Sequence, residues 1–188
     1  HLPLDQLDPY IDARLISDER AALLKVIERR ISERLPAAYL TNEAWLGDYR
    51  FYVDERVIVP RSHIAELLHE QLSPWVEDPW AVGRVLDLCT GSGCLAILAA
   101  HAFPEARIDA VDLSPEALAV ARRNVDDYEL GTRLRLVQSN AFAGIQGRQY
   151  DVIISNPPYV NAESMAVLPQ ELLLFGLCSY RTPLLPFR

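Results

Sequence analysis

Residues 85–96 read VLDLCTGSGCLA, and this stretch decides the fold class. Its first half is apolar enough to form a short buried strand, and its second half continues as a helix. Gly91, Gly93 and Ala96 match a glycine-rich fingerprint in its strand-to-helix context. Glycine permits a tight turn and lets a ligand approach the backbone closely. The order of strand, glycine turn and helix is typical of α/β folds that bind a nucleoside.

A second signal follows in residues 108–112, which read IDAVD. The strand expected here ends at Asp112, 21 residues after Gly91. An acid at this place can accept hydrogen bonds from both hydroxyls of a ribose. The alternative is that the glycines merely permit tight packing and that Asp112 caps a helix beginning at Pro115. We favour nucleoside binding, because strand, glycines, helix and acid occur in the order that it needs.

The rest of the chain supports an α/β fold, because short β-branched runs alternate with helical ones after Arg84. Strands are expected at residues 85–88, 108–111, 134–138 and 152–155, and helices at 94–103 and 115–128. Such alternation predicts a parallel sheet with right-handed crossovers. Ahead of it we expect an amphipathic helix at 17–35, a β-hairpin at 44–60 and a helix from Pro60 to about Leu72.

The last expected strand runs into an unusual tetrapeptide, since residues 151–159 read DVIISNPPY. Proline has no backbone N–H but keeps its carbonyl, so Pro157 and Pro158 leave acceptors without donors. Together with the side-chain oxygen of Asn156, the loop can offer acceptors to an NH2 group while Tyr159 covers its flat face. The tetrapeptide taken alone is equally consistent with a turn that ends a strand. In this context it indicates a site for an amide or an exocyclic amine.

The glycine loop does not separate a dinucleotide from S-adenosylmethionine, since both carry adenosine. A dehydrogenase needs a proton-relay residue, and none of the four histidines lies at the carboxyl end of an expected strand, where ligands bind in such folds. His63 and His69 fall on the helix after Pro60, and we interpret them as surface or packing residues. The Asn156 tetrapeptide does lie at a strand end, which favours S-adenosylmethionine.

The composition of the chain restricts the kinds of partner and site that can be expected. The chain has 188 residues, half of them hydrophobic, which suffices for one domain and a small appendage. Its net charge of −8 argues against a nucleic-acid partner held mainly through phosphates, although a local basic patch is left open. Three cysteines without zinc-site spacing predict reduced thiols and no metal site. Without a long apolar run or a signal peptide, the expected location is the cytoplasm.

The chain resembles the PrmB/HemK family of protein-glutamine N5-methyltransferases, and most of all its PrmB branch. The likeness covers residues 2 to about 171. Besides the glycine loop and the Asn156 tetrapeptide, it is carried by AYLTN at 38–42, FYVDERV at 51–57, and VPRS at 59–62 with Glu66. These additional blocks make it more specific, because DNA adenine methyltransferases share the glycine loop and the tetrapeptide.

The resemblance implies a Rossmann-like class I methyltransferase sheet that uses S-adenosylmethionine to methylate a glutamine of a large-subunit ribosomal protein. By position, the cofactor residues would be Asp87, Thr90, Gly91, Gly93, Asp112, Asn140 and Asn156. Asn156 and Pro157 would grip the glutamine amide, with Pro158 beside them and Tyr159 packed on it, so that Asn156, Pro157 and Tyr159 form the catalytic set. Arg61 is a candidate for anchoring substrate, with a surface ion pair as the alternative.

The same resemblance implies a division of the chain and a partner. Residues 1–43 would be a helical substrate-recognition segment, 44–60 a hairpin linker, 61–171 the methyltransferase domain and 172–188 an atypical tail. The ribosomal protein would be the partner, without membrane or direct nucleic-acid contact, and a homodimer is left open. Rival functions are a release-factor glutamine methyltransferase, a DNA or RNA amine methyltransferase, a dinucleotide oxidoreductase and an inactive remnant.

Two features depart from the family pattern. Asn140 stands where the family usually has an acid that contacts the adenine amine, which predicts weakened binding. After Glu171 the chain reads LLLFGLC and ends at Arg188, where the family continues with further strands and helices. From this we expect a truncated or altered terminus, an incomplete sheet and a poor or inactive enzyme.

Overall fold

The computed structural model describes residues 12–157 and divides the chain into two compact units, residues 1–35 and 36–188. The first unit holds α1 (Ser17–Ser32), which confirms the predicted amphipathic helix except for its last turn. The side chain of Glu19 reaches back to accept a hydrogen bond from the Ile16 N–H at 3.0 Å, which satisfies one free donor of the first turn. At the other end, Arg29 pairs with Glu33 at 3.0 Å.

The second unit begins with α2 (Ala37–Thr41) and an antiparallel hairpin of β1 (Ala44–Leu46) and β2 (Tyr49–Phe51). The hairpin was predicted, but its strands are shorter than the expected range of 44–60. After Phe51 the chain turns, because the Asp54 carboxylate accepts hydrogen bonds from the backbone and guanidinium of Arg56. Val53 and Val57 are buried as loop residues in the core, and not as members of a ladder.

The helix expected from Pro60 to about Leu72 is wrong in its length. The observed α3 covers Ile64–His69, and residues 60–63 belong to the connector that precedes it. Gln71 and Leu72 have φ angles of 53° and 57°, which a right-handed helix cannot accommodate. A short 3-10 helix, η3 (Pro79–Ala81), lies in the connector to the sheet.

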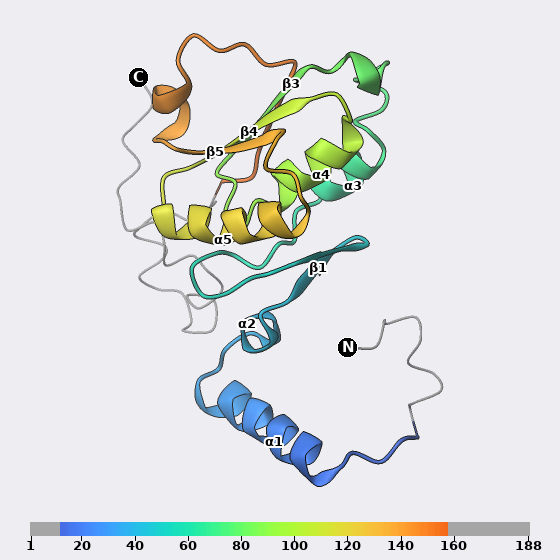
Figure 1. Cartoon of the computed structure of the whole chain (residues 1–188), viewed down its shortest axis with the longest axis vertical. Helices are drawn as coiled ribbons and strands as arrows, with labels where there is room; N and C mark the ends of the chain where they lie inside the picture. The colour runs from blue at the N-terminus through green and yellow to red at the C-terminus, as the bar shows by residue number, and fades with distance from the viewer. Residues whose placement is uncertain (1–11, 158–188) are drawn as a thin grey trace. The chain divides into compact units, whose positions relative to one another are not determined.

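Four parallel strands form the predicted sheet, in the order β5-β4-β3-β6 (Figure 1). Their bounds are β3 (Arg84–Leu88), β4 (Arg107–Asp112), β5 (Leu134–Gln138) and β6 (Val152–Ser155). The chain crosses over through α4 (Cys94–Ala102), α5 (Pro115–Asp127) and the 3-10 helix η4 (Ala141–Ile145). This confirms the α/β class and each strand that the sequence predicted after Arg84.

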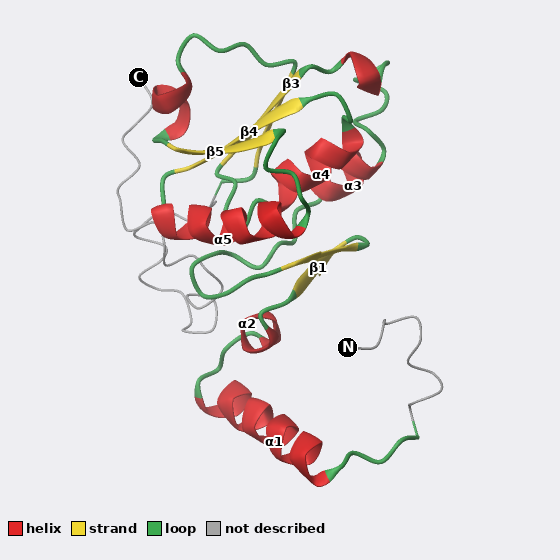
Figure 2. Cartoon of the chain, in the orientation of Figure 1, coloured by secondary structure: helices red, strands yellow, loops and turns green. Residues whose placement is uncertain are grey.

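The main core lies between the sheet and helices α4 and α5, which run along one face of it (Figure 2). Side chains alternate between the two faces of a strand. Val85 therefore packs in the main core, while Leu86 joins Val111 and Ile145 in a smaller cluster on the opposite face. Within residues 12–157, no helix is long and apolar enough to cross a membrane. The expectations about the tail after Glu171 lie outside the described residues.

Candidate functional site at the carboxyl edge of the sheet

The sheet brings four of the predicted site segments to one edge. Because all strands are parallel, their carboxyl ends lie together, and ligands of open α/β sheets bind there. The glycine loop follows β3, Asp112 ends β4, Asn140 follows β5 and Asn156 follows β6. The strand order places the glycine loop between Asp112 on one side and Asn156 on the other. These residues are at least 16 positions apart in the sequence, so the fold alone assembles them.

Within the loop, the two glycines do different things. Gly93 has φ +80° and begins α4, and a Cβ placed on it would lie 3.1 Å from the Cβ of Ala121. Its small size is therefore required for packing against α5. Gly91 has φ +56°, and a Cβ placed there would meet no heavy atom within 4 Å. Gly91 faces open space, which leaves room for a ligand to approach the backbone.

Asp112 holds the loop in place and is 2% exposed. One oxygen of its carboxylate accepts a hydrogen bond from the Gly91 N–H at 2.8 Å, and the other accepts from the Ser114 N–H at 3.0 Å. The cap of α5 is Ser114, whose hydroxyl accepts from the Ala117 N–H at 3.1 Å. Asp112 therefore does not cap α5, contrary to the alternative considered from the sequence.

Asp87 is a fully buried carboxylate behind the loop. Its Oδ2 accepts a hydrogen bond from the Thr90 hydroxyl at 2.5 Å, whereas its Oδ1 has no hydrogen-bond partner among the described residues. Burial raises the pKa of Asp87 to about 7, and the charge of Asp112 adds to this, against the lowering effect of the Thr90 hydrogen bond. A buried acceptor without a donor is costly. The site therefore suits a ligand that brings an N–H donor or a positive charge.

The remaining predicted residues differ in their exposure and in their place in the fold. Asn140 is exposed at the start of η4, and Asn156 is half-buried directly after β6 with Pro157 exposed beside it. Arg61 comes from the connector between β2 and α3 and not from a strand end. Pro158 and Tyr159 lie outside the described residues, so their predicted roles have no counterpart in this geometry.

Comparison with known proteins assigns the family. The methyltransferase small domain family matches residues 64–173, which is more than half of the chain. This chain belongs to that family. The matched range contains the glycine loop, Asp112, Asn140 and Asn156.

Among curated relatives, the chain is similar to proteins named ribosomal protein uL3 glutamine methyltransferase. It is 63% identical to the one from Bordetella pertussis over 171 residues, covering 91% of this chain and 57% of the relative. Identity to the one from Burkholderia pseudomallei is 62%, covering 91% and 58%, and to the one from Bradyrhizobium diazoefficiens 51%, covering 91% and 56%. The chain thus spans a little over half the length of these relatives.

The methyltransferase domain contains one structural residue of the site that the sequence reasoning missed. Asn124 of α5 is 1% exposed, and its amide group donates to the carbonyl oxygens of Ser92 at 2.8 Å and Tyr52 at 3.0 Å. Its side-chain oxygen accepts from the Tyr52 N–H at 2.7 Å. Asn124 therefore ties the glycine loop and the segment after the hairpin to α5. The available signal was an asparagine inside a helix, where that residue is unfavourable unless its side chain is used.

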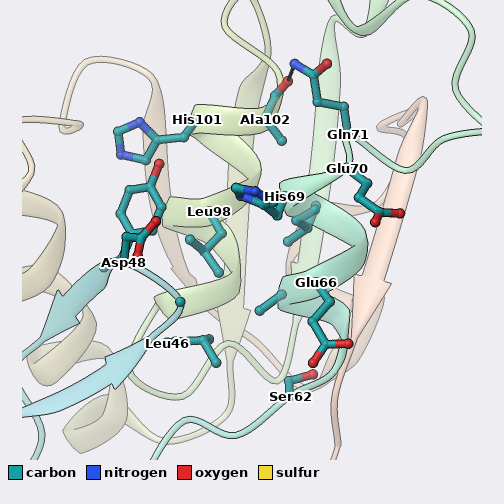
Figure 3. A pocket seen from close by; sticks show the side chains of 14 residues that line it. Leu46, Asp48, Ser62, Glu66, His69, Glu70, Gln71, Leu98, His101 and Ala102 are labelled. Carbon is teal, nitrogen blue, oxygen red and sulfur yellow. Dashed lines mark hydrogen bonds between the residues drawn. The ribbon is translucent and has the colours of Figure 1, made fainter.

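A hollow of about 610 Å³ lies elsewhere, between the hairpin turn, α3 and α4 (Figure 3). Asp48, Glu66 and Glu70 line it together with His69 and His101. Burial, aided by Arg133, lowers the pKa of His101, and its ring packs against that of Tyr49 with centroids 4.9 Å apart. His101 is therefore a neutral packing residue, and neither the glycine loop nor Asn156 borders this hollow. We place the chemistry at the carboxyl edge for that reason.

The cysteines of the methyltransferase domain play no reactive part in this geometry. Cys89 and Cys94 are free thiols, as the sequence predicted, while Cys178 lies outside the described residues. Burial raises the pKa of Cys89 to about 11 and that of Cys94 to about 12, so both stay protonated near neutral pH. Among residues 12–157, no cluster of histidine, cysteine and acidic side chains could hold a metal ion.

Proposed function

We propose that this chain carries the methyl-transfer site of an S-adenosylmethionine-dependent enzyme that methylates N5 of a glutamine in a large-subunit ribosomal protein. The observation that carries the proposal is the meeting of the glycine loop, Asp112 and Asn156 at one edge of a parallel sheet. The name shared by relatives up to 63% identical supports the glutamine and the ribosomal protein. Such an enzyme would act in the cytoplasm.

The residues present fit the methyl donor. Asp112 offers carboxylate oxygens to the ribose hydroxyls from the end of β4, and Gly91 leaves room for the adenosine beside the loop. Asn140 can accept a hydrogen bond from the adenine amine through its side-chain oxygen. The Oδ1 of Asp87, which lacks a partner among the described residues, suits the ammonium group of the methionine part, with Thr90 fixing the other carboxylate oxygen.

On the other side of the loop, Asn156 and the carbonyl of Pro157 would hold the acceptor amide. A glutamine side chain presents two N–H donors in one plane, and these two oxygens can accept both. Half-burial of Asn156 favours a specific contact, since water competes less with it. Pro158 and Tyr159 would complete the grip, the tyrosine by packing on the flat amide.

Positioning must carry the reaction, because the lone pair of an amide nitrogen is delocalised into its carbonyl. When bound, S-adenosylmethionine supplies a methyl group on a positively charged sulfur. Asn156 and Pro157 would aim the amide nitrogen at that methyl, and their oxygens would stabilise the positive charge that develops on nitrogen. As the new C–N bond forms, the bond from the methyl group to sulfur would break and its electron pair would return to sulfur, which becomes neutral. The amide nitrogen would release one of its two protons to water.

A transfer assay with tritium-labelled donor tests the proposal. Ribosomal protein uL3, a release factor and DNA would be offered in parallel to this chain and to a version extended to the full length of the relatives. Label on a uL3 glutamine, located by mass spectrometry, is expected from the extended version, and little or none from this chain. Label on the release factor or on DNA instead would replace the ribosomal protein by one of these rival substrates. A dinucleotide oxidoreductase would instead change NADH fluorescence, and an inactive remnant would bind the donor without transferring label.

A further inference from the structure

Arginine side chains gather at the amino ends of the strands, opposite to the edge described above. Six of them line a hollow of about 480 Å³, and we call this set the arginine groove: Arg84, Arg107, Arg122, Arg133, Arg135 and Arg148. Asp109 is the one acidic residue among the described residues that line it. In a chain with a net charge of −8, the groove is a strongly positive region.

The topology puts these side chains together. Arg84 begins β3 and Arg107 begins β4, and the two are register partners across the parallel pair. Arg135 of β5 is likewise the register partner of Asp109 on β4. Because parallel strands start at the same edge, the arginines share one edge although they are up to 64 positions apart in the sequence.

Three of the arginines already have partners. The carboxylate of Asp109 accepts from the Nε of Arg135 and from a terminal nitrogen of Arg148, each at 2.9 Å. Arg133 donates to backbone carbonyls at the end of α4, including that of Pro104 at 2.7 Å. Carbonyls carry no net charge, so they occupy the donors of Arg133 without neutralising it.

The other three arginines are available. Arg84, Arg107 and Arg122 are exposed, and their guanidinium groups form no hydrogen bond or ion pair within residues 12–157. Their positive charges are therefore not neutralised by an ion pair within the described part of the chain. Charges of one sign placed side by side repel one another, and an anionic ligand relieves that repulsion.

The shape of the region favours a chain of phosphates over a single anion. Arg84 and Arg148 also border a second hollow of about 410 Å³, so these two arginines face two neighbouring binding positions. The one acidic residue among the described residues of that hollow, Asp151, accepts hydrogen bonds from the backbone N–H groups of Gly83 and Arg84 at 2.8 Å. The planar guanidinium fork matches phosphate oxygens. No aromatic side chain lines either hollow among the described residues, so bases would find no stacking platform.

We propose that the arginine groove binds the phosphate backbone of RNA without reading its sequence. Phosphate contacts position a partner and carry no sequence information. The net charge predicts no nucleic-acid partner for the chain as a whole, but its uneven distribution leaves this one edge suited to RNA. Binding at the amino edge does not require methyl transfer at the carboxyl edge, so the two proposals can fail independently.

Fluorescence anisotropy with a labelled 12-nucleotide uridylate RNA tests this inference on the full chain between 0.05 and 0.2 M salt. The variant R84Q/R107Q/R122Q removes the three unpartnered arginines and leaves the Asp109 cluster intact. We expect it to bind at least about 10-fold more weakly, with a salt slope shallower by about 2, because each phosphate contact on a single strand contributes about 0.7.

Two variants serve as controls. R14Q/R20Q/R30Q removes the same charge from the first unit and should change RNA affinity less than twofold. R84K/R107K/R122K keeps the charge and should retain most of the binding, which also shows that the positions tolerate substitution. Circular dichroism melts of all three variants exclude unfolding as the cause.

Several outcomes would overturn the inference. Equal loss in R84Q/R107Q/R122Q and R14Q/R20Q/R30Q would show that net charge, and not the groove, attracts RNA. Competition by uridine monophosphate as strong as that by RNA at equal phosphate concentration would indicate a small-anion site. Equal competition by polyglutamate of matched charge would indicate an acidic protein partner.

Discussion

Two buried aspartates on neighbouring strands of one sheet have opposite protonation behaviour. Asp87, behind the glycine loop, has an oxygen without a partner among the described residues, and burial raises its pKa to about 7. Burial also disfavours the ionised form of Asp109. Hydrogen bonds from Tyr150 and Arg135 and the charge of Arg148 nevertheless hold its pKa below the usual value. A buried carboxylate whose oxygens all accept hydrogen bonds, such as that of Asp109, stabilises the fold. A buried carboxylate oxygen without a partner, such as that of Asp87, indicates where a ligand completes the site.

Among substitutions at the two edges of the sheet, the largest effect is expected from Asn156→Ala at the carboxyl edge, made in a version extended to the full length of the relatives. Loss of its side-chain oxygen would remove the acceptor that we propose positions and stabilises the amide nitrogen, and removal of one such group typically slows catalysis roughly 100- to 1,000-fold. Donor affinity, measured by calorimetry, should stay within about threefold, because the lost contact is to the substrate. The matched control is Asn140→Ala, which should weaken donor binding with little change in the transfer step. Near-normal turnover of Asn156→Ala would remove that residue from the mechanism.

The next effect concerns stability and pH. The folded state holds the Asp87 proton up to about pH 7, whereas an unfolded aspartate loses it near pH 4. Between these values the folded state binds more protons, so the free energy of unfolding falls as pH rises, and above pH 7 the full cost is present. Asp87→Asn cannot ionise and should escape that fall. From pH 5 to pH 8 it should gain roughly 2–4 kcal/mol relative to the parent, at 1.36 kcal/mol per pKa unit.

Urea unfolding at both pH values measures this difference. The control is Asp126→Asn on the exposed side of α5, which should follow the parent curve. Asp109→Asn should be less stable than the parent by about the same amount at both pH values, because its folded carboxylate is stabilised by its partners and both values lie above the pKa of an unfolded aspartate. Parallel curves for the parent and Asp87→Asn would mean that Asp87 is ionised in the folded protein.

A smaller effect is expected from Asp112→Asn on donor binding. The substitution keeps the size and one acceptor but removes the charge, and a hydrogen bond to a charged group contributes about 1.5–3 kcal/mol. Calorimetry should therefore show affinity lower by about 10-fold or more. Because Asp112 also accepts from Gly91, the melting temperature must be measured beside it to separate loop damage from a lost ligand contact. Unchanged affinity would place the ribose elsewhere.

The sequence predicted the sheet better than its surroundings, for a physical reason. The bounds of β5 and β6 match their predicted ranges to the residue, because runs rich in Leu, Val and Ile are bounded by turn residues, such as Gly131 before β5 and Pro157 after β6. The hairpin and α3 came out shorter than predicted. Val53 and Val57 fit the pattern of apolar residues expected in a strand, although the side chain of Asp54 accepts a hydrogen bond that turns the chain between them. The periodicity of apolar residues does not show where a side-chain hydrogen bond replaces strand pairing.

The carboxyl edge was predictable because its residues follow strands in a known order, but the contacts that support it were not. Asn124 joins the loop to residue 52 across 72 positions, and Asp109 gathers Arg135 and Arg148 from two later segments. Contacts of this kind depend on tertiary distance alone and leave no local pattern. The arginine groove was missed for the same reason.

The smallest effect expected is the most direct test of the comparison between the edges. R84Q/R107Q/R122Q removes three positive charges at the amino edge, and the methyl donor is itself positively charged. The edges are separated by strands of five to six residues, which at about 3.3 Å per residue is roughly 16–20 Å. That distance is about twice the Debye length of about 8 Å at 0.15 M salt, so solvent ions screen most of the interaction. Donor affinity at 0.15 M salt should therefore change less than twofold, although RNA binding is largely lost. A larger change in donor affinity that persists at higher salt would show that the two edges are coupled through the structure of the sheet and not through long-range electrostatic interaction.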